Sequence, residues 1–220
     1  MKTLVVDVGG TNVKVLASGH RIPIKIKSGP TLTPRDMVRA VLDATSDWTY
    51  DRVSMGYPGP VEDGKPTREP WNLGAGWVGF DFRKAFGKPL RLVNDAAMQA
   101  LGSYEGGTML FLGLGTGLGS AMIRNGTLIP LELAHLPYRH GKTYEDWIGE
   151  AGMKRLGKNR WRKHVAAVVA LLTEGFLADY VVLGGGNVRH MKRLPKGARR
   201  GQNANAFKGG YRLWSTAVNA

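Results

Sequence analysis

The sequence predicts an α/β protein with two lobes, each of which opens with a glycine-rich β-hairpin. Residues 4–16 (LVVDVGGTNVKVL) place a glycine pair between two runs of aliphatic and β-branched residues, the pattern of two buried strands joined by a tight turn. Residues 110–123 (LFLGLGTGLGSAMI) have the same form, and Leu4 aligns with Leu110 without a gap. Such a repeat indicates an internal duplication, so we expect two related α/β units that face each other across a cleft.

The first lobe is expected over residues 1–105, with strands and helices following its hairpin. Thr33-Pro34 marks a helix start, because a capping hydroxyl precedes a proline at the first helical position. Short apolar or alternating runs mark the strands. The expected elements are an edge strand over 21–27, a helix from 33, a strand over 52–57, a short helix over 81–86, a strand over 90–93 and a helix over 96–104.

The second lobe is expected over residues 106–220. After its hairpin, Asn125-Gly126 is a strong turn signal. The tail from Arg189 onward is basic and glycine-rich, and the sequence leaves its order open. The other expected elements are a loop over 131–140, helices over 144–156 and 160–177, and a buried strand over 180–183.

Composition restricts the class of protein. The 220 residues include no cysteine, which excludes disulfides and thiolate metal sites, and no apolar run is long enough to span a membrane. The polar N-terminus does not resemble a signal peptide, so a cytoplasmic protein is expected. The net charge of +14 is unusual, and such a positive field attracts polyanions such as nucleic acid, an acidic membrane or a phosphate chain.

The hairpin turns are candidate phosphate sites. A turn rich in Gly, Thr and Asn exposes backbone N–H groups and hydroxyls, which suit a phosphate, and Asp7 adds a carboxylate at the strand end. Either hairpin alone is consistent with an ordinary glycine turn. The matched pair favours a nucleotide or phosphate chain held from both sides.

Polar residues at other strand ends and loops are candidates for chemistry. Asp95 follows a strand and begins a helix, where it could accept a proton from a substrate hydroxyl or simply cap the helix. Glu132 and His135 lie three residues apart in a loop and could bind sugar hydroxyls or form an ordinary surface pair. Glu145 lies in the first turn of a helix, where acids are common. Residues 184–186 are glycines that could admit a base or a ribose.

Together these segments resemble the ROK family of sugar kinases, and most closely its polyphosphate glucokinases, within the actin-like ATPase superfamily. The similarity covers nearly the whole chain. The matching segments occur in the family's order: DVGGTNVK at 7–14, GYPGPV at 56–61, NL at 72–73 with Trp77, ND at 94–95, LGTGLG at 114–119, ELAH at 132–135, Glu145 and GGG at 184–186.

This resemblance implies the two-lobed actin-like (ribonuclease H-like) fold and a role for each matched residue. Asp95 would be the catalytic base, and Asp7 would lie near Mg²⁺. The sugar-binding residues would be Asn72, Asn94, Glu132, His135 and Glu145. The phosphate- or nucleotide-binding residues would be Gly9, Gly10, Thr11, Asn12, Lys14, Gly115, Thr116, Gly117, Gly184, Gly185 and Gly186.

The sequence also departs from the family's pattern. Ala134 replaces the glycine of the ELGH motif, and the cysteine cluster that binds zinc in many members is missing, so no zinc is expected. The segment after Gly186 is short, which leaves the adenine pocket, and with it the donor, open.

The expected function is transfer of a phosphoryl group from polyphosphate or ATP to the 6-hydroxyl of glucose or a related hexose. The alternative is a non-catalytic sugar- or phosphate-binding protein, such as a nucleic-acid-associated relative of the ROK repressors. The first phosphate strand begins at Leu4, so no helix-turn-helix is expected ahead of it, and a nucleic-acid partner is not favoured. A homodimer is the assembly considered, and no membrane partner is expected.

Two basic runs favour polyphosphate as a donor at least as good as ATP. A solvated basic surface is the usual role of such runs, but few acids lie among them here. The first run comprises Lys154, Arg155, Lys158, Arg160, Arg162 and Lys163, and the second comprises Arg189, Lys192, Arg193, Lys196, Arg199 and Arg200.

Overall fold

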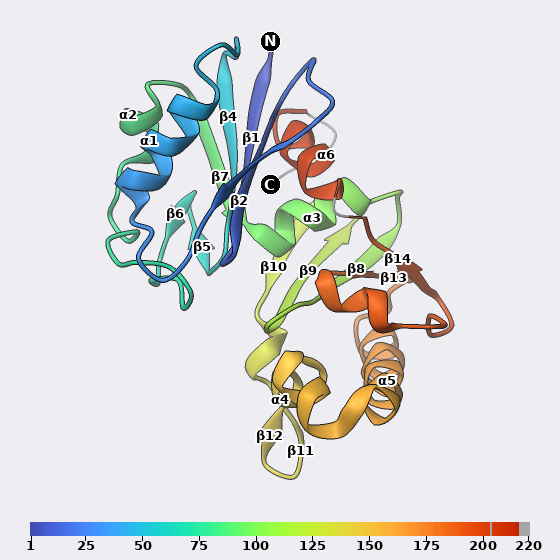
Figure 1. Ribbon diagram of the computed structural model, residues 1–220. Helices are drawn as coiled ribbons and strands as arrows, with labels where there is room; N and C mark the ends of the chain where they lie inside the picture. Colours follow the sequence, from blue (N-terminus) through green and yellow to red (C-terminus); the bar gives the residue numbers. More distant parts are fainter. Residues whose placement is uncertain (203, 216–220) are drawn as a thin grey trace.

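The computed structural model describes residues 1–202 and 204–215, and it confirms the two-lobed α/β fold (Figure 1). The first lobe is built on a five-stranded sheet in the order β3-β2-β1-β4-β7. Its strands β1, β4 and β7 are parallel, whereas β2 pairs antiparallel with both β1 and β3. The strands of this lobe are β1 (Thr3–Val8), β2 (Asn12–Ala17), β3 (Ile24–Lys27), β4 (Arg52–Tyr57), β7 (Leu90–Asn94) and the small hairpin β5 (Val61–Glu62) with β6 (Lys65–Pro66).

The second lobe repeats this topology. Its sheet has the order β10-β9-β8-β13-β14, with β8, β13 and β14 parallel and β9 pairing antiparallel with both β8 and β10. The two sheets therefore correspond strand by strand, as the duplication predicts. The strands are β8 (Thr108–Leu114), β9 (Leu118–Arg124), β10 (Thr127–Leu131), β13 (Tyr180–Gly184), β14 (Ala198–Arg200) and the hairpin β11 (Pro137–Arg139) with β12 (Lys142–Thr143).

Helices separate and cover the two sheets. Leu4 and Val6 of β1 face the outer helices of the first lobe, whereas Val5 faces the helices between the lobes, as the alternation of a strand requires. In the second lobe, Leu110 of β8 packs with α5, whereas Phe111 packs with α3 and α6. The helices are α1 (Pro34–Ala44), α2 (Phe82–Phe86), α3 (Asp95–Ser103), α4 (Tyr144–Ile148), α5 (Glu150–Gly175) and α6 (Asn205–Arg212), with 3₁₀ turns η1 (Leu133–His135) and η2 (Gly186–His190).

Helices α3 and α6 cross at unusually short range. A side chain at Gly102 of α3 would collide with the backbone of Asn205, and one at Gly209 of α6 would collide with the carbonyl of Met98. Gly210 packs in the same way against Val5 of β1. Glycines therefore allow α6 to reach the first sheet, where the Ser54 hydroxyl donates to the carbonyl of Gly210.

The helix predicted over 144–156 is interrupted at one residue, Gly149. Gly149 is extended and separates α4 from α5. The break predicted between 156 and 160 is confirmed, because Gly157, with φ of +73° and ψ of 156°, is non-helical and kinks α5 into two helical parts. The second half of α5 buries one face, with Trp161 completely buried. Residues 131–140 are not only loop, since they include the end of β10, η1 and β11.

Within the described ranges, 1–202 and 204–215, no helix is both long and apolar enough to cross a membrane.

Candidate active site

The first glycine turn is fixed from two sides. The Gly9 N–H donates to the Asn12 carbonyl across the turn, at 3.1 Å. From the start of the next loop, Ser28 donates its hydroxyl to the Gly9 carbonyl at 2.6 Å and its N–H to the Thr11 carbonyl at 3.1 Å. The backbone of Gly10 lies so close to the Asn72 side chain that an added Cβ would be 3.0 Å from it. The loop carrying Asn72 therefore lies against the phosphate hairpin.

Asp7 lies at the end of β1, with 9% of its surface exposed. Its carboxylate accepts from the Lys14 ammonium at 3.4 Å, across the antiparallel pair. Burial raises the pKa of Asp7, and the Lys14 charge only partly offsets that effect. A carboxylate and an ammonium thus lie together beside the first turn.

Asp95 is the first residue of α3, at the end of β7. The N-cap is Asn94, whose side-chain oxygen accepts from the N–H groups of Ala96 and Ala97 at 2.9 and 3.2 Å, while its amide donates to the Gly59 carbonyl. The Asp95 carboxylate also accepts from Ala96, at 2.7 Å. The capping position considered for Asp95 therefore belongs to its neighbour.

The surroundings of Asp95 shift its protonation. Burial, followed by the negative charges of Asp7 and Glu132, raises its pKa to about 7, and the hydrogen bond from Ala96 opposes this rise. Asp7 belongs to the first lobe and Glu132 to the second, so the carboxylate of Asp95 lies within electrostatic range of both. A carboxyl group with a pKa near neutrality can exchange protons readily, which suits a general base.

The second glycine turn has matching supports. The Gly115 N–H donates to the Gly117 carbonyl at 3.1 Å, and the buried Asn187 side chain donates to the Gly115 carbonyl at 2.8 Å. The Glu145 carboxylate accepts from the Leu118 N–H at 3.0 Å. These contacts join the turn to η2 on one side and to α4 on the other.

Glu132 is positioned by a residue that the motif analysis did not single out. The buried Ser120 hydroxyl donates to the Leu131 carbonyl at 2.8 Å and accepts from the Leu133 N–H at 3.1 Å, so it holds the chain on both sides of Glu132. The exposed Glu132 side chain follows β10 directly, and His135 ends η1.

The charges around Glu132 come from three segments. Desolvation raises its pKa, His135 and Arg68 lower it, and Glu145 raises it again. Arg68 is held by the buried Tyr57, whose hydroxyl donates to the Arg68 carbonyl at 2.7 Å. The predicted sugar residues of the second lobe therefore interact electrostatically with one another and with an arginine of the first lobe.

The three glycines at the end of β13 and directly after it differ in their surroundings. A side chain at Gly184 would collide with the ring of Phe111, and one at Gly185, whose φ is +81°, would collide with the backbone of Leu114. Packing therefore explains both residues without a ligand. Gly186 is exposed with no atom near its Cβ position, so it alone of the three leaves room for a bound group.

Trp77, from the segment that resembles the family's sugar-contacting motif, is completely buried between Tyr57 and Phe82. It stabilises the loop rather than facing a ligand. Four residues of the site could not be recognised in the sequence, because their partners lie in other segments. They are Ser28, Ser120, Asn187 and Arg68. The buried asparagine directly after the triple glycine was the one local signal available.

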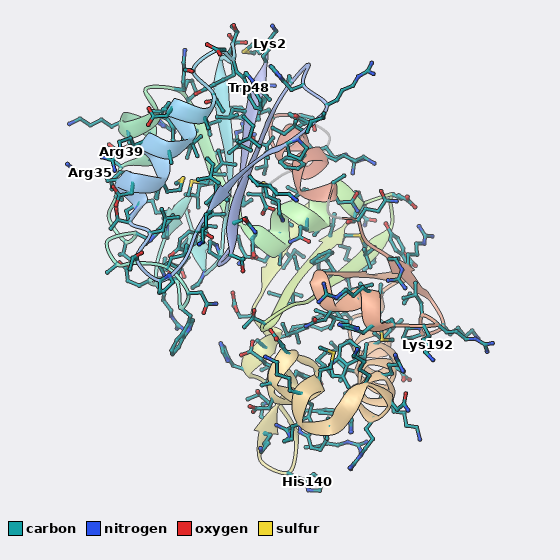
Figure 2. The ribbon with its side chains drawn as sticks, viewed as in Figure 1. Lys2, Arg35, Arg39, Trp48, His140 and Lys192 are labelled. Atoms are coloured by element: carbon teal, nitrogen blue, oxygen red, sulfur yellow. The ribbon has the colours of Figure 1, made fainter. Side chains whose placement is uncertain are left out.

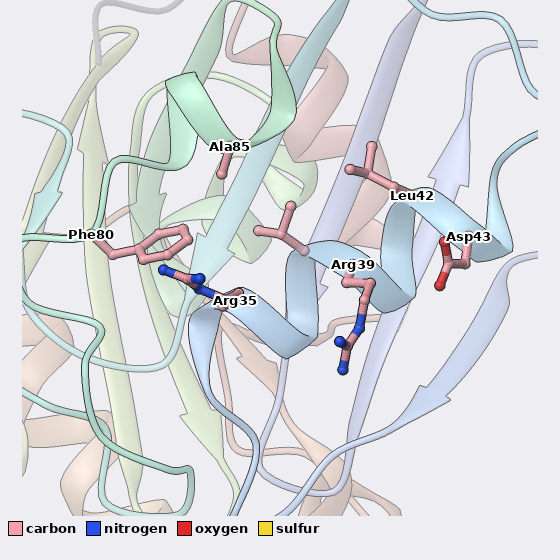
Figure 3. A pocket seen from close by; sticks show the side chains of 7 residues that line it. Arg35, Arg39, Leu42, Asp43, Phe80 and Ala85 are labelled. Carbon is pink, nitrogen blue, oxygen red and sulfur yellow. The ribbon is translucent and has the colours of Figure 1, made fainter.

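Two cavities lie outside this cluster of acids. One, of about 260 Å³, lies between α1 and α2, where Arg35 lies beside Phe80 and Arg39 lies farther along α1 (Figure 3). The other, of about 1220 Å³, runs along β7 from Leu90 to Asn94 and is also lined by the β5–β6 hairpin, β10 and Trp214. Only the second reaches a predicted site residue.

The donor set near Asp7 suits a hard cation. Among the described residues no group of three or more His, Asp or Glu is arranged to hold a metal ion. Mg²⁺, however, is commonly bound by one or two carboxylates together with substrate phosphates. Asp7 and Asp95 supply two carboxylates whose mutual repulsion contributes to the raised pKa of Asp95. They fit a cation that arrives with the phosphates of the donor.

Comparison with solved structures identifies the fold. A crystal structure of inorganic polyphosphate/ATP-glucomannokinase from Arthrobacter sp. strain KM superposes with a TM-score of 0.80 over 95% of this chain and 96% of that chain, at 22% identity. A ROK family glucokinase from Streptomyces griseus, in complex with glucose and AMPPNP, gives a TM-score of 0.76 over 97% and 99% of the two chains, at 17% identity. No family profile matches the chain.

Sequence comparison shows to which group of sugar kinases the chain is most similar. A polyphosphate glucokinase of Mycobacterium tuberculosis is 30% identical over 203 residues, which cover 82% of this chain and 76% of the relative. A polyphosphate glucokinase of Mycobacterium leprae is 28% identical over 211 residues, covering 86% and 64%. The chain belongs to the ROK family of sugar kinases. Within it the chain groups with the polyphosphate glucokinases, which confirms the resemblance found in the motifs.

Proposed function

We propose that the protein transfers a phosphoryl group from inorganic polyphosphate or ATP to the 6-hydroxyl of glucose or a related hexose. The observation that carries this proposal is the position of Asp95, a carboxyl group with a pKa of about 7 placed between the phosphate hairpin of one lobe and the Glu132 loop of the other. The names of the curated relatives support both the acceptor and the two donors.

In the reaction, Asp95 accepts the proton of the sugar hydroxyl while the hydroxyl oxygen bonds to the terminal phosphorus. The bond from that phosphorus to the bridging oxygen of the donor breaks, and a shortened polyphosphate or ADP leaves with the bonding electron pair. Asn72, Asn94, Glu132, His135 and Glu145 would orient the sugar. Because the ground-state pKa of Asp95 is near 7, little free energy is needed to convert it between acid and base at neutral pH.

The two turns would hold the phosphates through their backbone N–H groups, as glycine-rich turns do. Lys14 lies beside Asp7, where its ammonium group would stabilise the negative charge that develops on the donor phosphates. The ATP-using members of the family use a divalent metal, and Mg²⁺ near Asp7 would neutralise phosphate charge in the transition state. Catalysis of this kind depends mainly on positioning and on electrostatic stabilisation.

A coupled assay tests the proposal. Glucose, mannose and other hexoses are each offered with ATP and with polyphosphate, and formation of the sugar phosphate and the shortened donor is measured. We expect turnover with glucose and at least one donor, and its loss in Asp95→Asn. Absence of turnover with every hexose and both donors, while sugar or phosphate still binds, would support the non-catalytic alternative instead.

A further inference from the structure

Two basic patches flank the N-terminal part of α5, and each surrounds a histidine. The η2 patch comprises Lys158, Arg162, Arg189 and His190, and desolvation followed by the three cations lowers the pKa of His190. The hairpin patch comprises Arg139, Arg155, Arg160 and His164, and desolvation followed by its three arginines lowers the pKa of His164. In both patches the cations lie close enough to repel an added proton.

The η2 patch is continuous with the second phosphate turn through η2 itself. Asn187, which donates to the Gly115 carbonyl, belongs to the same five-residue turn as Arg189 and His190. The Glu150 N–H donates to the Thr116 carbonyl at 3.2 Å, and Lys154 together with the weaker effect of Arg189 lowers the pKa of Glu150. Arg189 therefore lies near both contacts of the second turn, because it follows Asn187 by two residues and its charge reaches Glu150.

The hairpin patch is built around aromatic rings instead. Trp147 packs against His164 with ring centroids 4.4 Å apart, and Arg155 lies over the Trp147 ring at 5.5 Å. Arg139 lies over Tyr138 at 5.3 Å. Figure 2 shows His140, the residue after Arg139, at the far end of the second lobe, whereas Lys192, two residues beyond His190, extends from its side.

Some cations of the two basic runs already have partners within the described part of the chain, and others do not. Arg199 pairs with Glu105 and lies over the Tyr180 ring, and Arg200 donates to the carbonyls of Val188 and Met191, so both are already engaged. Arg162 likewise donates to the His190 carbonyl at 2.7 Å. Lys158 has no hydrogen-bond or ion-pair partner among the described residues, and the Arg189 side chain hydrogen-bonds there only to His190. These two side chains are available to an anion.

We propose that the η2 patch extends the donor site, so that a polyphosphate chain leaving the second glycine turn passes over η2 and lies against Arg189 and Lys158. This inference rests on the proposed function, since it assigns a path to one of the two donors. Polyphosphate fits because its charge repeats along the chain, whereas a triphosphate ends at the turns. The hairpin patch reaches the second turn through α4, but there Arg155 already donates to the Asp146 carbonyl at 2.7 Å and lies over the Trp147 ring, so this patch is not part of the path.

The test compares two double variants of equal charge. Lys158→Gln/Arg189→Gln removes the two available cations of the η2 patch, and Arg139→Gln/Arg160→Gln removes two from the hairpin patch. KM is measured for long-chain polyphosphate, tripolyphosphate and ATP across a salt series. In the first variant we expect KM for long chains to rise roughly tenfold, with a clearly smaller change for tripolyphosphate and ATP. The salt slope for long chains should fall by about 0.7 for each phosphate that the variant no longer neutralises.

Calorimetric titration of long-chain polyphosphate without sugar supplies a readout independent of turnover, and the first variant should bind more weakly than wild type. The hairpin-patch variant should match wild type in every measurement. Equal changes for long chains and tripolyphosphate, or equal effects of the two variants, would overturn the proposed path. Turnover with ATP but neither use nor binding of polyphosphate would overturn the path while leaving the sugar kinase intact. Weaker binding of long chains by the first variant, in a protein whose wild type is inactive with all donors, would support the path and refute the proposed reaction.

Discussion

Replacing Asp95 by Asn should stabilise the protein at neutral pH while it abolishes turnover. The pKa of Asp95 rises from 3.8 to about 7 on folding, because its charge is desolvated and repelled by Asp7 and Glu132. The folded state therefore holds the proton more tightly than the unfolded state does. Below about pH 4 both states are protonated and the group costs nothing. As the pH rises from about 4 through 7, the unfolded state gains from ionisation first, so stability is lost.

The size of the effect follows from the shift. Each pKa unit corresponds to about 1.4 kcal/mol, so a shift of about three units gives at most about 4 kcal/mol of destabilisation above pH 7. Asn is neutral at every pH and keeps an oxygen for the N–H of Ala96. The variant should therefore gain most stability relative to wild type at pH 8 and little at pH 4.

Urea denaturation of the ligand-free protein at pH 4, 6 and 8 measures this difference, and comparing the two proteins at each pH cancels the contribution of the titrating groups that do not interact with residue 95. The same variant should lose about 10²–10⁴ in rate, and wild-type kcat/KM should rise with pH to a plateau above about pH 7. A variant less stable than wild type at pH 8 would refute the electrostatic argument, because the carboxylate would then be well satisfied. Wild-type turnover in a folded variant would refute the role of base.

Further variants test the supports of the site and of the helix crossing. Glu132→Ala should raise the sugar KM by about 10- to 100-fold through lost charged hydrogen bonds, and an unchanged KM for every active sugar would remove Glu132 from the site. Ser120→Ala should cost about 1–3 kcal/mol in urea denaturation and raise the sugar KM more than the donor KM, a split that a merely structural role would not produce. Asn187→Ala frees the Gly115 carbonyl and should raise KM for ATP and polyphosphate alike; an effect on polyphosphate alone would contradict this. Gly209→Ala should lower stability by about 3 kcal/mol, measured as a shift in the urea midpoint, and a midpoint equal to wild type would show that the helix crossing relaxes.

The repeat of the hairpins was enough to predict two equivalent sheets, because alternation and turn chemistry are local signals. The end of α4, the first helix of the second lobe, could not be predicted from such local signals. The break at Gly157 was expected, but the earlier interruption depends on Gly149 adopting an extended conformation, with φ of −72° and ψ of 179°, which any residue could adopt. Helix α6 lies in the tail whose order the sequence left open, because its KGG segment is a poor helix former and the helix is stabilised by packing against Gly102.

The candidate catalytic residue could be recognised in the sequence, but the residues that position the site could not. Asp95 stood out because it follows an apolar strand, and the sequence left two roles open for it. The structure assigns the cap to Asn94, since the side-chain torsions that decide between adjacent residues depend on the Gly59 loop. Ser120 gave no signal at all, because its two partners, Leu131 and Leu133, are brought to it only by the pairing of β9 with β10.

The close crossing of α3 and α6 also has a consequence for how the protein unfolds. Tyr211 donates to the carbonyl of Leu16 across 195 positions of sequence, and Ser54 donates to that of Gly210 across 156. The apolar cluster around this crossing includes Val5 of the first sheet and Phe111 of the second. Neither sheet can therefore lose its inner cover without exposing the other, and the two lobes should melt in one cooperative step. During synthesis the inner face of β1 stays uncovered until α6 is made, so a nascent chain lacking α6 should depend on chaperones.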